Sequence, residues 1–210
     1  TANDNSDLCT TDIDADGNLS VSYTANDNGE CAITVTADDS SGSTLDESFT
    51  VTVNPVNDPV TLTAGIDDYT VLEDAASTSV ADLDNVFDDI DLTNGADEHL
   101  QTLSYSVTAN DNSDLCTTDI DADGNLSVGY LTDQNGSCNI SVTATDNPAD
   151  EDNSSLTIDF IVTVKQINDD PILSFIGDQF TDEDSSFDIP VSAFDIDIET
   201  NGQTLNFDLV

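Results

Sequence analysis

The chain has 210 residues and carries 45 Asp and Glu side chains against one Lys and no Arg. The formal net charge of −44 excludes nucleic acid as a partner, because the chain has no cationic surface that could neutralise phosphates. Repulsion among roughly one uncompensated negative charge for every five residues opposes compaction, so the composition predicts that divalent cations or high salt neutralise the carboxylates.

The first element that the sequence defines is TANDNSDLCTTDIDADGNLSVSY at 1–23, because this segment recurs later in the chain. It returns at 108–130 with a single substitution. Further along, FTVTV at 49–53 matches FIVTV at 160–164. Self-similarity of this kind indicates tandem structural repeats.

An alternating apolar strand that runs into an Asn-Asp pair and a proline also occurs twice. The first copy is VTVNPVNDPV at 51–60, and the second is VTVKQINDDPIL at 162–173. Alternation with period two is typical of a half-buried strand, and the proline ends that strand. We therefore place domain boundaries after residues 58 and 168. This divides the chain into segments 1–58, 59–168 and 169–210.

The middle segment contains short strand candidates separated by turns rich in Gly, Asn and Asp. The candidates are Val60–Thr63, Tyr69–Leu72, Thr78–Leu83, Leu100–Thr108, Cys116–Asp121, Asn125–Tyr130 with Cys138–Thr145, and Leu156–Lys165. The sequence shows no helical periodicity, and this spacing of strands is typical of an antiparallel β-sandwich of the immunoglobulin-like sort. The predicted fold class is all-β, with tandem antiparallel β-sandwiches.

The two flanking segments each correspond to half of a sandwich. Thr1 and Val210 both align with Thr108, so the repeat is cut mid-domain at both ends. Segment 1–58 is then the second half of a sandwich and 169–210 the first half, and neither can bury its sheet face or pair its edge strands alone. We expect the tail of one unit to complete the head of the next, covalently in a longer array or by strand complementation between copies. Either route gives a filament.

Four cysteines, Cys9, Cys31, Cys116 and Cys138, allow three pairings. Their equal spacing in the two copies favours one bridge within each repeat, and disulfides predict an oxidising, extracellular location. A zinc site is disfavoured, because no cysteine has a CxxC neighbour and His99 is the only histidine. No apolar run reaches the length of a membrane span. Since a signal peptide and a leading Met are also absent, we expect a mature portion or an excerpt of a longer protein.

The segment from Val142 to Pro171 resembles a cadherin repeat, because VTATD is followed by a loop, an alternating strand and INDDP. The same order holds for VTADD and VNDP between Val35 and Pro59. The combination of an N-D-x-P linker with a following E-D is similar, more closely still, to the cadherin-like tandem repeats of large bacterial surface adhesins. This resemblance covers the whole chain. It implies cadherin-like β-sandwiches joined by linkers that bind Ca²⁺.

Matched residue by residue, the resemblance implies a set of Ca²⁺ ligands at each junction between repeats. The linkers supply Asn57 and Asp58, and Asn168 with Asp169 or Asp170; the A-x-D acids are Asp39 and Asp146; the glutamates after the linkers are Glu73 and Glu183; the D-x-D pairs are Asp89 with Asp91 and Asp195 with Asp197. The family's L-D-R-E element is absent, although Asp27 and Asp133 lie near its position, and the linkers lack the full D-x-N-D-N. Fewer or weaker ions per junction are therefore expected. Ca²⁺ suits such clusters because it takes about six to eight oxygen ligands in flexible geometry.

Two other patterns have a chemical interpretation. The segments Asp12, Asp14, Asp16, Gly17 and Asp119, Asp121, Asp123, Gly124 resemble the start of an EF-hand loop. Their twelfth position is Tyr23 or Tyr130 instead of Glu, so an edge hairpin is favoured. N-x-S/T sequons begin at Asn18, Asn125, Asn135, Asn139 and Asn153, and they leave the attachment of glycans open.

The sequence predicts that the chain is not an enzyme, because no Ser/His or Cys/His pairing repeats and Trp is absent for stacking sugars. The favoured function is a structural segment of an extracellular, Ca²⁺-stabilised repeat array. Copies of the chain or adjacent repeats would join head to tail as an adhesin stalk or surface filament. The alternative is a binding module that recognises a glycan or a partner through sandwich loops. That function would require an exposed aromatic or apolar patch repeated in each unit.

Overall fold

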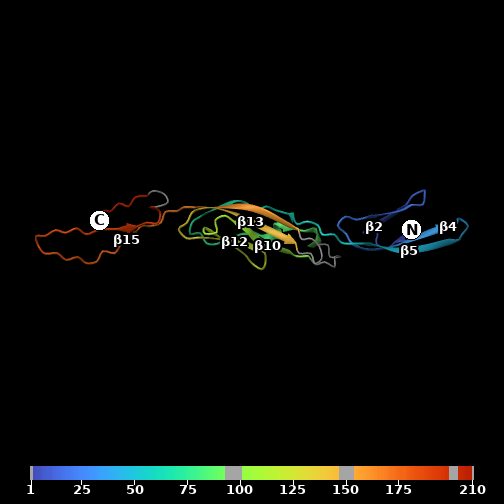
Figure 1. Ribbon diagram of the computed structural model, residues 1–210, viewed down its shortest axis with the longest axis horizontal. Coiled ribbons are helices and arrows are strands. Elements are labelled where there is room, and N and C mark those ends of the chain that lie inside the picture. The colour runs from blue at the N-terminus through green and yellow to red at the C-terminus, as the bar shows by residue number, and fades with distance from the viewer. Residues whose placement is uncertain (1, 93–100, 147–153, 199–202, 210) are drawn as a thin grey trace.

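The structure is a computed structural model that describes residues 2–92, 101–146, 154–198 and 203–209. The molecule is elongated, and a central β-sandwich separates an N-terminal portion from a C-terminal portion at the opposite end (Figure 1). His99 and the sequon residue Asn153 lie outside the described residues. None of the described helices is long and apolar enough to cross a membrane.

The central sandwich contains two sheets and a short ribbon. One sheet has the strand order β10-β13-β14-β7, the other has the order β11-β12-β8, and β6 pairs with β9 in the ribbon. The strands are β6 (Thr61–Leu62), β7 (Tyr69–Leu72), β8 (Thr78–Asp82), β9 (Phe87–Asp88), β10 (Leu103–Asn110), β11 (Cys116–Ile120), β12 (Asn125–Tyr130), β13 (Gly136–Asp146) and β14 (Ser155–Lys165). Two 3-10 turns, η1 (Leu83–Asn85) and η2 (Ile90–Leu92), flank β9.

The predicted all-β fold is confirmed, and the strands differ from the prediction only in detail. Strands β7 and β12 have the predicted bounds, whereas β9 and the two 3-10 turns are not predicted by the sequence. Among the described residues, every strand pair is antiparallel except one, because β7 runs parallel to β14 with Tyr69 opposite Val162. The chain passes from one sheet to the other between β7 and β8. Because β7 and β14 are far apart in the chain, no hairpin turn forces them to run antiparallel.

The two sheets of the central sandwich bury their facing side chains between them. Val128 of β12 and Val142 of β13 are completely buried, and Phe160 of β14 is 1% exposed. The ring of Phe160 stacks on that of Tyr69, with centroids 6.4 Å apart. Alternation along each strand places the apolar residues on the inner face, so burial of these side chains holds the sheets together.

The N-terminal portion repeats only part of this architecture. Its strands are β1 (Ala2–Asn3), β2 (Cys9–Ile13), β3 (Leu19–Tyr23), β4 (Gly29–Asp38) and β5 (Thr44–Val53). They form a β1-β4-β5 sheet and a β2-β3 pair. The buried apolar cluster is small and consists of Leu8, Cys9, Cys31 and Ile33.

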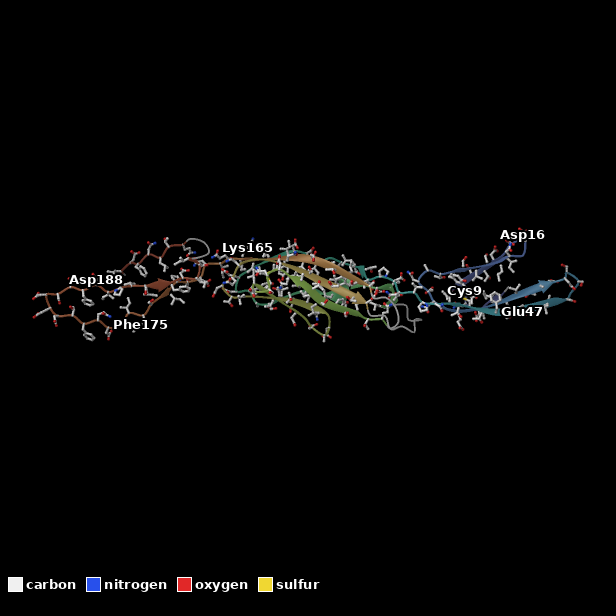
Figure 2. All side chains as sticks on the ribbon, in the orientation of Figure 1. Cys9, Asp16, Glu47, Lys165, Phe175 and Asp188 are labelled. Atoms are coloured by element: carbon white, nitrogen blue, oxygen red, sulfur yellow. A yellow bond between two sulfur atoms is a disulfide. The ribbon has the colours of Figure 1, made fainter. Side chains whose placement is uncertain are left out.

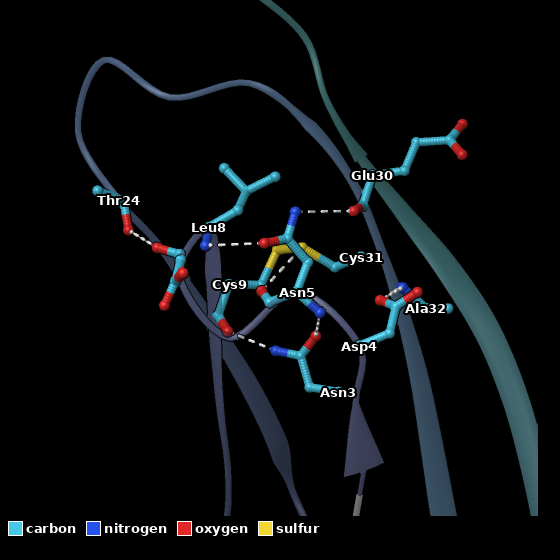
Figure 3. The surroundings of a disulfide bond; sticks show 10 residues. Asn3, Asp4, Asn5, Leu8, Cys9, Thr24, Glu30, Cys31 and Ala32 are labelled. Carbon is cyan, nitrogen blue, oxygen red and sulfur yellow. Dashed lines mark hydrogen bonds between the residues drawn. A yellow bond between two sulfur atoms is a disulfide. The ribbon is translucent and has the colours of Figure 1, made fainter. Parts of the chain in front are cut away.

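A disulfide bridge connects two sheets in each copy of the repeat. Cys116 of β11 bonds Cys138 of β13, with Cα atoms 6.3 Å apart. Cys9 of β2 bonds Cys31 of β4 in the same way, with Cα atoms 6.4 Å apart (Figure 3). These are the two bridges that the equal spacing favours, and no described cysteine is free.

The C-terminal portion has little regular structure within the described residues. Its strands are β15 (Ile172–Leu173) and β16 (Ala193–Phe194), which pair antiparallel. Large apolar side chains are exposed here: Phe175, labelled in Figure 2, is 95% exposed and Phe180 is 91% exposed. This portion therefore has no apolar core of its own comparable to that of the central sandwich.

Candidate metal centres

Acidic and amide side chains meet where the first linker enters the central sandwich. We call this cluster junction 1, and it consists of Asn57, Asp58, Asp89, Asp91, Gln101 and Asp146. The 3-10 turn η2 positions the D-x-D pair, because the Asp91 N–H donates to Asp89 Oδ1 at 3.0 Å. The linker is attached to the same pair, because the Asp58 N–H donates to Asp91 Oδ2 at 2.7 Å.

The other members of junction 1 come from β13 and from the segment before β10. Asn57 Nδ2 donates to Asp146 Oδ2 at 3.1 Å, and Gln101 Nε2 donates to Asn57 Oδ1 at 2.5 Å. Asp146 is the last residue of β13, and the N–H and hydroxyl of Ser154 donate to its two carboxylate oxygens at 2.6 and 2.7 Å. The A-x-D acid and the linker asparagine are therefore held in direct contact.

Asp89 carries a buried carboxylate next to three other acids. Its side chain is 0% exposed, and its Oδ2 has no hydrogen-bond partner among the described residues. Burial raises the pKa of Asp89, and the charges of Asp91, Asp146 and Asp58 raise it further, while the hydrogen bond from the Asp91 amide acts in the opposite direction. The Oε1 of Gln101 is also buried without a partner. A cation would satisfy both oxygens.

The second linker makes the same contacts at the other end of the central sandwich, in a cluster that we call junction 2. Its members are Glu73, Asp74, Asp133, Asn168, Asp169, Asp195, Asp197 and Gln203. The Asp169 N–H donates to Asp197 Oδ2 at 2.6 Å, and the Asp197 N–H donates to Asp195 Oδ1 at 2.9 Å. Gln203 Nε2 donates to Asn168 Oδ1 at 2.8 Å. Each of these bonds has a counterpart in junction 1, so both linkers are fixed by the same interactions.

Junction 2 also receives acids from the sandwich that precedes its linker. Carboxylate oxygens of Glu73, Asp169 and Asp197 lie within 4.8 Å of one another, and those of Asp74, Asp133 and Asp169 do so as well. Asp74 and Asp133 adopt left-handed backbone conformations, with φ of 62° and 56°, and the Asp133 N–H donates to Asp74 Oδ1 at 3.0 Å. Asp169 belongs to both groups, which makes it the centre of the cluster.

Asp169 shows the same electrostatic strain as Asp89. Its Oδ2 is buried and has no hydrogen-bond partner among the described residues. Desolvation raises the pKa of Asp169, and the neighbouring charges of Asp133, Asp74, Asp197 and Glu73 raise it further. These carboxylates repel one another unless a cation lies between them.

The donor atoms of both junctions suit Ca²⁺. In the part of the chain that the structure describes, the side chains of the two clusters offer carboxylate and amide oxygens and no thiolate or imidazole. Hard divalent cations prefer such oxygens, and Ca²⁺ tolerates irregular geometry better than Mg²⁺. The oxygens without donors, Asp89 Oδ2, Gln101 Oε1 and Asp169 Oδ2, lie inside the same clusters. The residues present therefore fit the cation that the sequence implies.

Three of the sequence-predicted ligands lie outside both junctions. Asp39 is exposed just beyond β4, and its Oδ1 accepts the N–H groups of Ser41 and Ser43 at 2.8 and 3.1 Å. Glu183 is exposed in the C-terminal portion. Asp170 is exposed and belongs to neither acidic group, which leaves Asp169 as the acid of the second linker.

Sequence reasoning missed several residues of the junctions. Gln101, Gln203 and Asp74 are not among the predicted ligands, and Asp133 is named only as lying near a missing element. A signal for the glutamines exists, because Q-T-L recurs at 101–103 and at 203–205. This motif is not part of the cadherin resemblance, so the resemblance does not mark the two glutamines as ligands.

The EF-hand-like segments form hairpin turns, as favoured from the sequence. Asp121 Oδ1 accepts the N–H groups of Asp123 and Asn125, both at 2.9 Å. Hydrogen bonds from the backbone and side chain of Asn125 lower the pKa of Asp121. Asp14 makes the equivalent bonds in the first copy, with the N–H groups of Asp16 and Asn18. These aspartates stabilise the turn.

The fold matches that of tandem cadherin extracellular domains. The structure of human CDH23 EC21-23 aligns with 92% of this chain at 19% identity and a TM-score of 0.55, and the chain spans 62% of that structure. Human mucin-like protocadherin EC1-2 aligns with 76% of this chain and 81% of its own, at 11% identity and a TM-score of 0.47. A glycoside hydrolase family 107 endo-fucoidan hydrolase aligns at 18% identity over 80% of this chain and 23% of its own, with a TM-score of only 0.37. No family model matches the chain, and no curated protein sequence matches it significantly.

Proposed function

We propose that this chain is a structural segment of an extracellular repeat array in which Ca²⁺ stiffens the junctions between cadherin-like β-sandwiches. One observation carries the proposal: both linkers make the same contact to a D-x-D acid, and each junction contains a buried carboxylate oxygen without a donor among the described residues. Such a cluster is unfavourable without a cation. The array serves as an adhesin stalk or a surface filament, in keeping with the resemblance to repeats of bacterial surface adhesins.

At junction 2 the acids come from three consecutive pieces of the chain. Glu73 and Asp133 belong to the central sandwich, Asp169 belongs to the linker, and Asp197 belongs to the portion that follows. A cation held by all three pieces would link the two sandwiches directly. The linker would lose its hinge motion, and head-to-tail repeats would behave as a rod.

Two features support an extracellular setting for this array. Both disulfides are of the kind that forms and persists in oxidising compartments. Extracellular Ca²⁺ modules bind the ion with dissociation constants of about 10⁻⁴ to 10⁻³ M. Weak sites of this kind would be filled outside the cell and would need no ideal ligand set.

The decisive experiment removes the cation. In millimolar Ca²⁺ we expect X-ray scattering to give an extended chain with a narrow distribution of lengths. Chelation should broaden that distribution, lower the melting temperature and expose the linker at 166–171 to protease. Mg²⁺ at the same concentration should restore little, because it demands near-octahedral geometry and keeps its water. The proposal is wrong if chelation changes none of the three measurements.

A further inference from the structure

The N-terminal portion has open strand edges where the central sandwich has paired ones. In the central sandwich, the outer edge of β14 pairs with β7. The equivalent edge of β5 has no partner among the described residues, because β5 is the last strand of the β1-β4-β5 sheet. Similarly, β12 pairs with β8, whereas β3 is hydrogen-bonded within a described sheet only to β2. Open edges of this kind are sites where another strand can add.

The inner face of the N-terminal sheet is also less well covered than that of the central sandwich. Phe160 is 1% exposed, whereas Phe49, its counterpart in the repeat, is 40% exposed. Val162 is completely buried, and its counterpart Val51 is only partly buried. Both phenylalanines lie opposite an isoleucine of the neighbouring strand, so the local pairing is the same. The difference arises because the described residues of the central sandwich include a layer that covers this face, whereas those of the N-terminal portion do not.

The C-terminal portion holds the segments that would form this layer. Strand β15 pairs with β16 as β6 pairs with β9, so the C-terminal portion and the central sandwich begin with the same short strand pair. Residues 179–182 precede Glu183 as β7 precedes Glu73. The residues that follow, Asp184 and Asp74, share the same left-handed backbone, each with φ of 62°.

The C-terminal portion contains an apolar hollow of about 540 Å³. Leu173, Ile176, Val191, Ala193, Phe207 and Leu209 are among the residues that line it. Phe207 is the counterpart of Tyr105 in the repeat, and the Tyr105 ring lies in the central sandwich, stacked on Phe87 at 6.0 Å. The hollow thus corresponds to the inner face of the layer that contains Tyr105 in the central sandwich, and among the described residues of the C-terminal portion no second layer packs on it.

We infer that residues 171–198 and 203–209 of a second copy of this chain dock on residues 2–53 and complete a sandwich like the central one. Residues 179–182 pair with the open edge of β5. Residues 205–209 pair with the part of β4 beyond Thr34, because among the described residues β1 covers that side of β4 only at Ile33 and Thr34. The two surfaces lie at opposite ends of one molecule, with the central sandwich between them, so they do not meet within one copy (Figure 1). Because the surfaces are different, each added copy leaves one surface free, and the assembly grows as an open filament.

Docking also brings acids to junction 1, and this consequence rests on the proposed function. At junction 2, Glu73 lies beside the linker acid Asp169. Glu183 of the docked copy takes the equivalent place beside Asp58. An open hollow of about 320 Å³ is present there, lined among others by Asn26, Asp27, Val56, Asp58 and Asp91. The filament contact and the Ca²⁺ site at junction 1 therefore form together.

Cysteine pairs test the contact in the full chain. Thr70 lies opposite Thr163 in the β7–β14 pair, and the counterparts of these residues are Phe180 and Thr52. A mixture of the variants Thr52→Cys and Phe180→Cys should give a disulfide-linked dimer under mild oxidation. The yield should exceed that of Thr52→Cys with Thr181→Cys on the order of tenfold, because a shift of one residue turns the side chain to the other face.

A second cysteine pair tests the contact at β4 independently. It keeps the docking testable if one of the first two variants fails to fold. Tyr105 lies opposite Ala144 in the β10–β13 pair, and the counterparts are Phe207 and Ala37. The pair Ala37→Cys and Phe207→Cys should therefore also form a dimer. Light scattering of the unmodified chain should show masses in multiples of 22.2 kDa that grow with concentration.

Two results would overturn the inference. One is a chain that stays at 22.2 kDa at every concentration, with neither cysteine pair cross-linking. The other is equal cross-linking by the register-shifted control. Running the same samples in Ca²⁺ and in chelator separates the two proposals. Loss of stiffness without any cross-link rejects docking and keeps the Ca²⁺-stiffened array, whereas cross-links with no effect of chelation keep docking and reject the array's dependence on Ca²⁺.

Discussion

At the scale of single residues, the junctions orient carboxylates with backbone N–H groups and leave other oxygens free for a cation. Asp89 Oδ1 accepts the Asp91 amide, whereas its Oδ2 has no donor. In junction 2 the Asp169 amide holds Asp197, and Asp169 Oδ2 has no donor. The carboxylates are thus fixed before an ion arrives, which reduces the entropy lost on binding.

Because Asp169 belongs to both acidic groups of junction 2, substituting it is the most informative single test of Ca²⁺ binding there. Asp169→Asn should weaken Ca²⁺ binding at junction 2 by on the order of tenfold or more, about 1.4 kcal/mol, because both acidic groups contain this residue. Asp170→Asn removes the same charge from an exposed neighbour outside both groups and should change the affinity only slightly. Isothermal titration calorimetry at one ionic strength measures the Ca²⁺ affinity of both variants. Equal losses would mean that bulk charge, and not the cluster, attracts the ion.

The raised pKa values of Asp89 and Asp169 predict a pH dependence whose sign changes with Ca²⁺. The ordinary pKa is 3.8, and a carboxyl with a raised pKa on folding stabilises the fold below that value and loses this contribution as pH rises through the folded pKa. In metal-stripped buffer the melting temperature should therefore be higher near pH 4 than at pH 7. In saturating Ca²⁺ the order should reverse, because protons compete with the ion.

Scanning calorimetry at both pH values, with and without Ca²⁺, measures this reversal. Asp89→Asn should reduce the metal-free pH dependence more than Asp170→Asn, which removes an equal charge at an exposed site. Comparing the two variants is needed because the net charge of −44 by itself makes the fold more stable at acid pH, where protonation lowers the overall repulsion. If the two variants behave alike, Asp89 has no special part in the pH dependence.

Most acids of the junctions could be predicted from the sequence, but Asp74 could not, and neither could the division of the acids between the two sites. The repeat marks Asp58 and Asp169 as equivalent, and the structure gives both the same amide contact to a D-x-D acid. Asp39 and Glu183 belong to the same predicted set and are exposed. Their roles remain predictions for the assembled chain, because a residue pattern does not show which repeat supplies the other half of a site.

At the scale of elements, strands could be predicted better than their partners. Alternation of apolar residues is a local signal, so β7 and β12 are found with their observed bounds. The parallel pairing of β7 with β14 joins Tyr69 to Val162, which are far apart in sequence, and depends on how the chain crosses between sheets. Strand β9 and the 3-10 turns are too short for any periodic signal.

The repeat offers a matched pair of core substitutions. Phe160→Ala should destabilise the central sandwich by about 3–5 kcal/mol, because a fully buried aromatic side chain leaves a cavity. Phe49→Ala should cost less than half of that in the isolated chain, since this ring is 40% exposed. In the assembled filament the two costs should converge, because docking covers Phe49. Hydrogen exchange, read separately on β13–β14 and β4–β5, measures each cost.

The isolated and assembled states are both needed to interpret that comparison. A large effect of Phe49→Ala in the isolated chain would show that the N-terminal portion already has a complete core. A small effect in both states would show that no layer covers Phe49 on assembly.

At the scale of the whole molecule, charge and shape act together. Acidic side chains lie along the entire length, with Asp16 and Asp188 toward opposite ends (Figure 2). An elongated arrangement keeps these charges farther apart than a globule of the same mass would, which lowers their repulsion. Repulsion favours an extended molecule but does not prevent bending at the two linkers. The stiffness of the molecule therefore depends on how firmly the two junctions are held.

Monovalent salt and Ca²⁺ should therefore act on different properties of the molecule. About 1 M NaCl shortens the Debye length to about 3 Å, so in metal-free buffer it should raise the melting temperature of the sandwiches by screening. Na⁺ does not tie Glu73, Asp169 and Asp197 together as a divalent ion would, so the linkers should remain mobile and the scattering lengths broadly distributed. Millimolar Ca²⁺ at low ionic strength should narrow that distribution. If 1 M NaCl alone narrows it equally, screening stiffens the chain and the junction acids contribute only their charge.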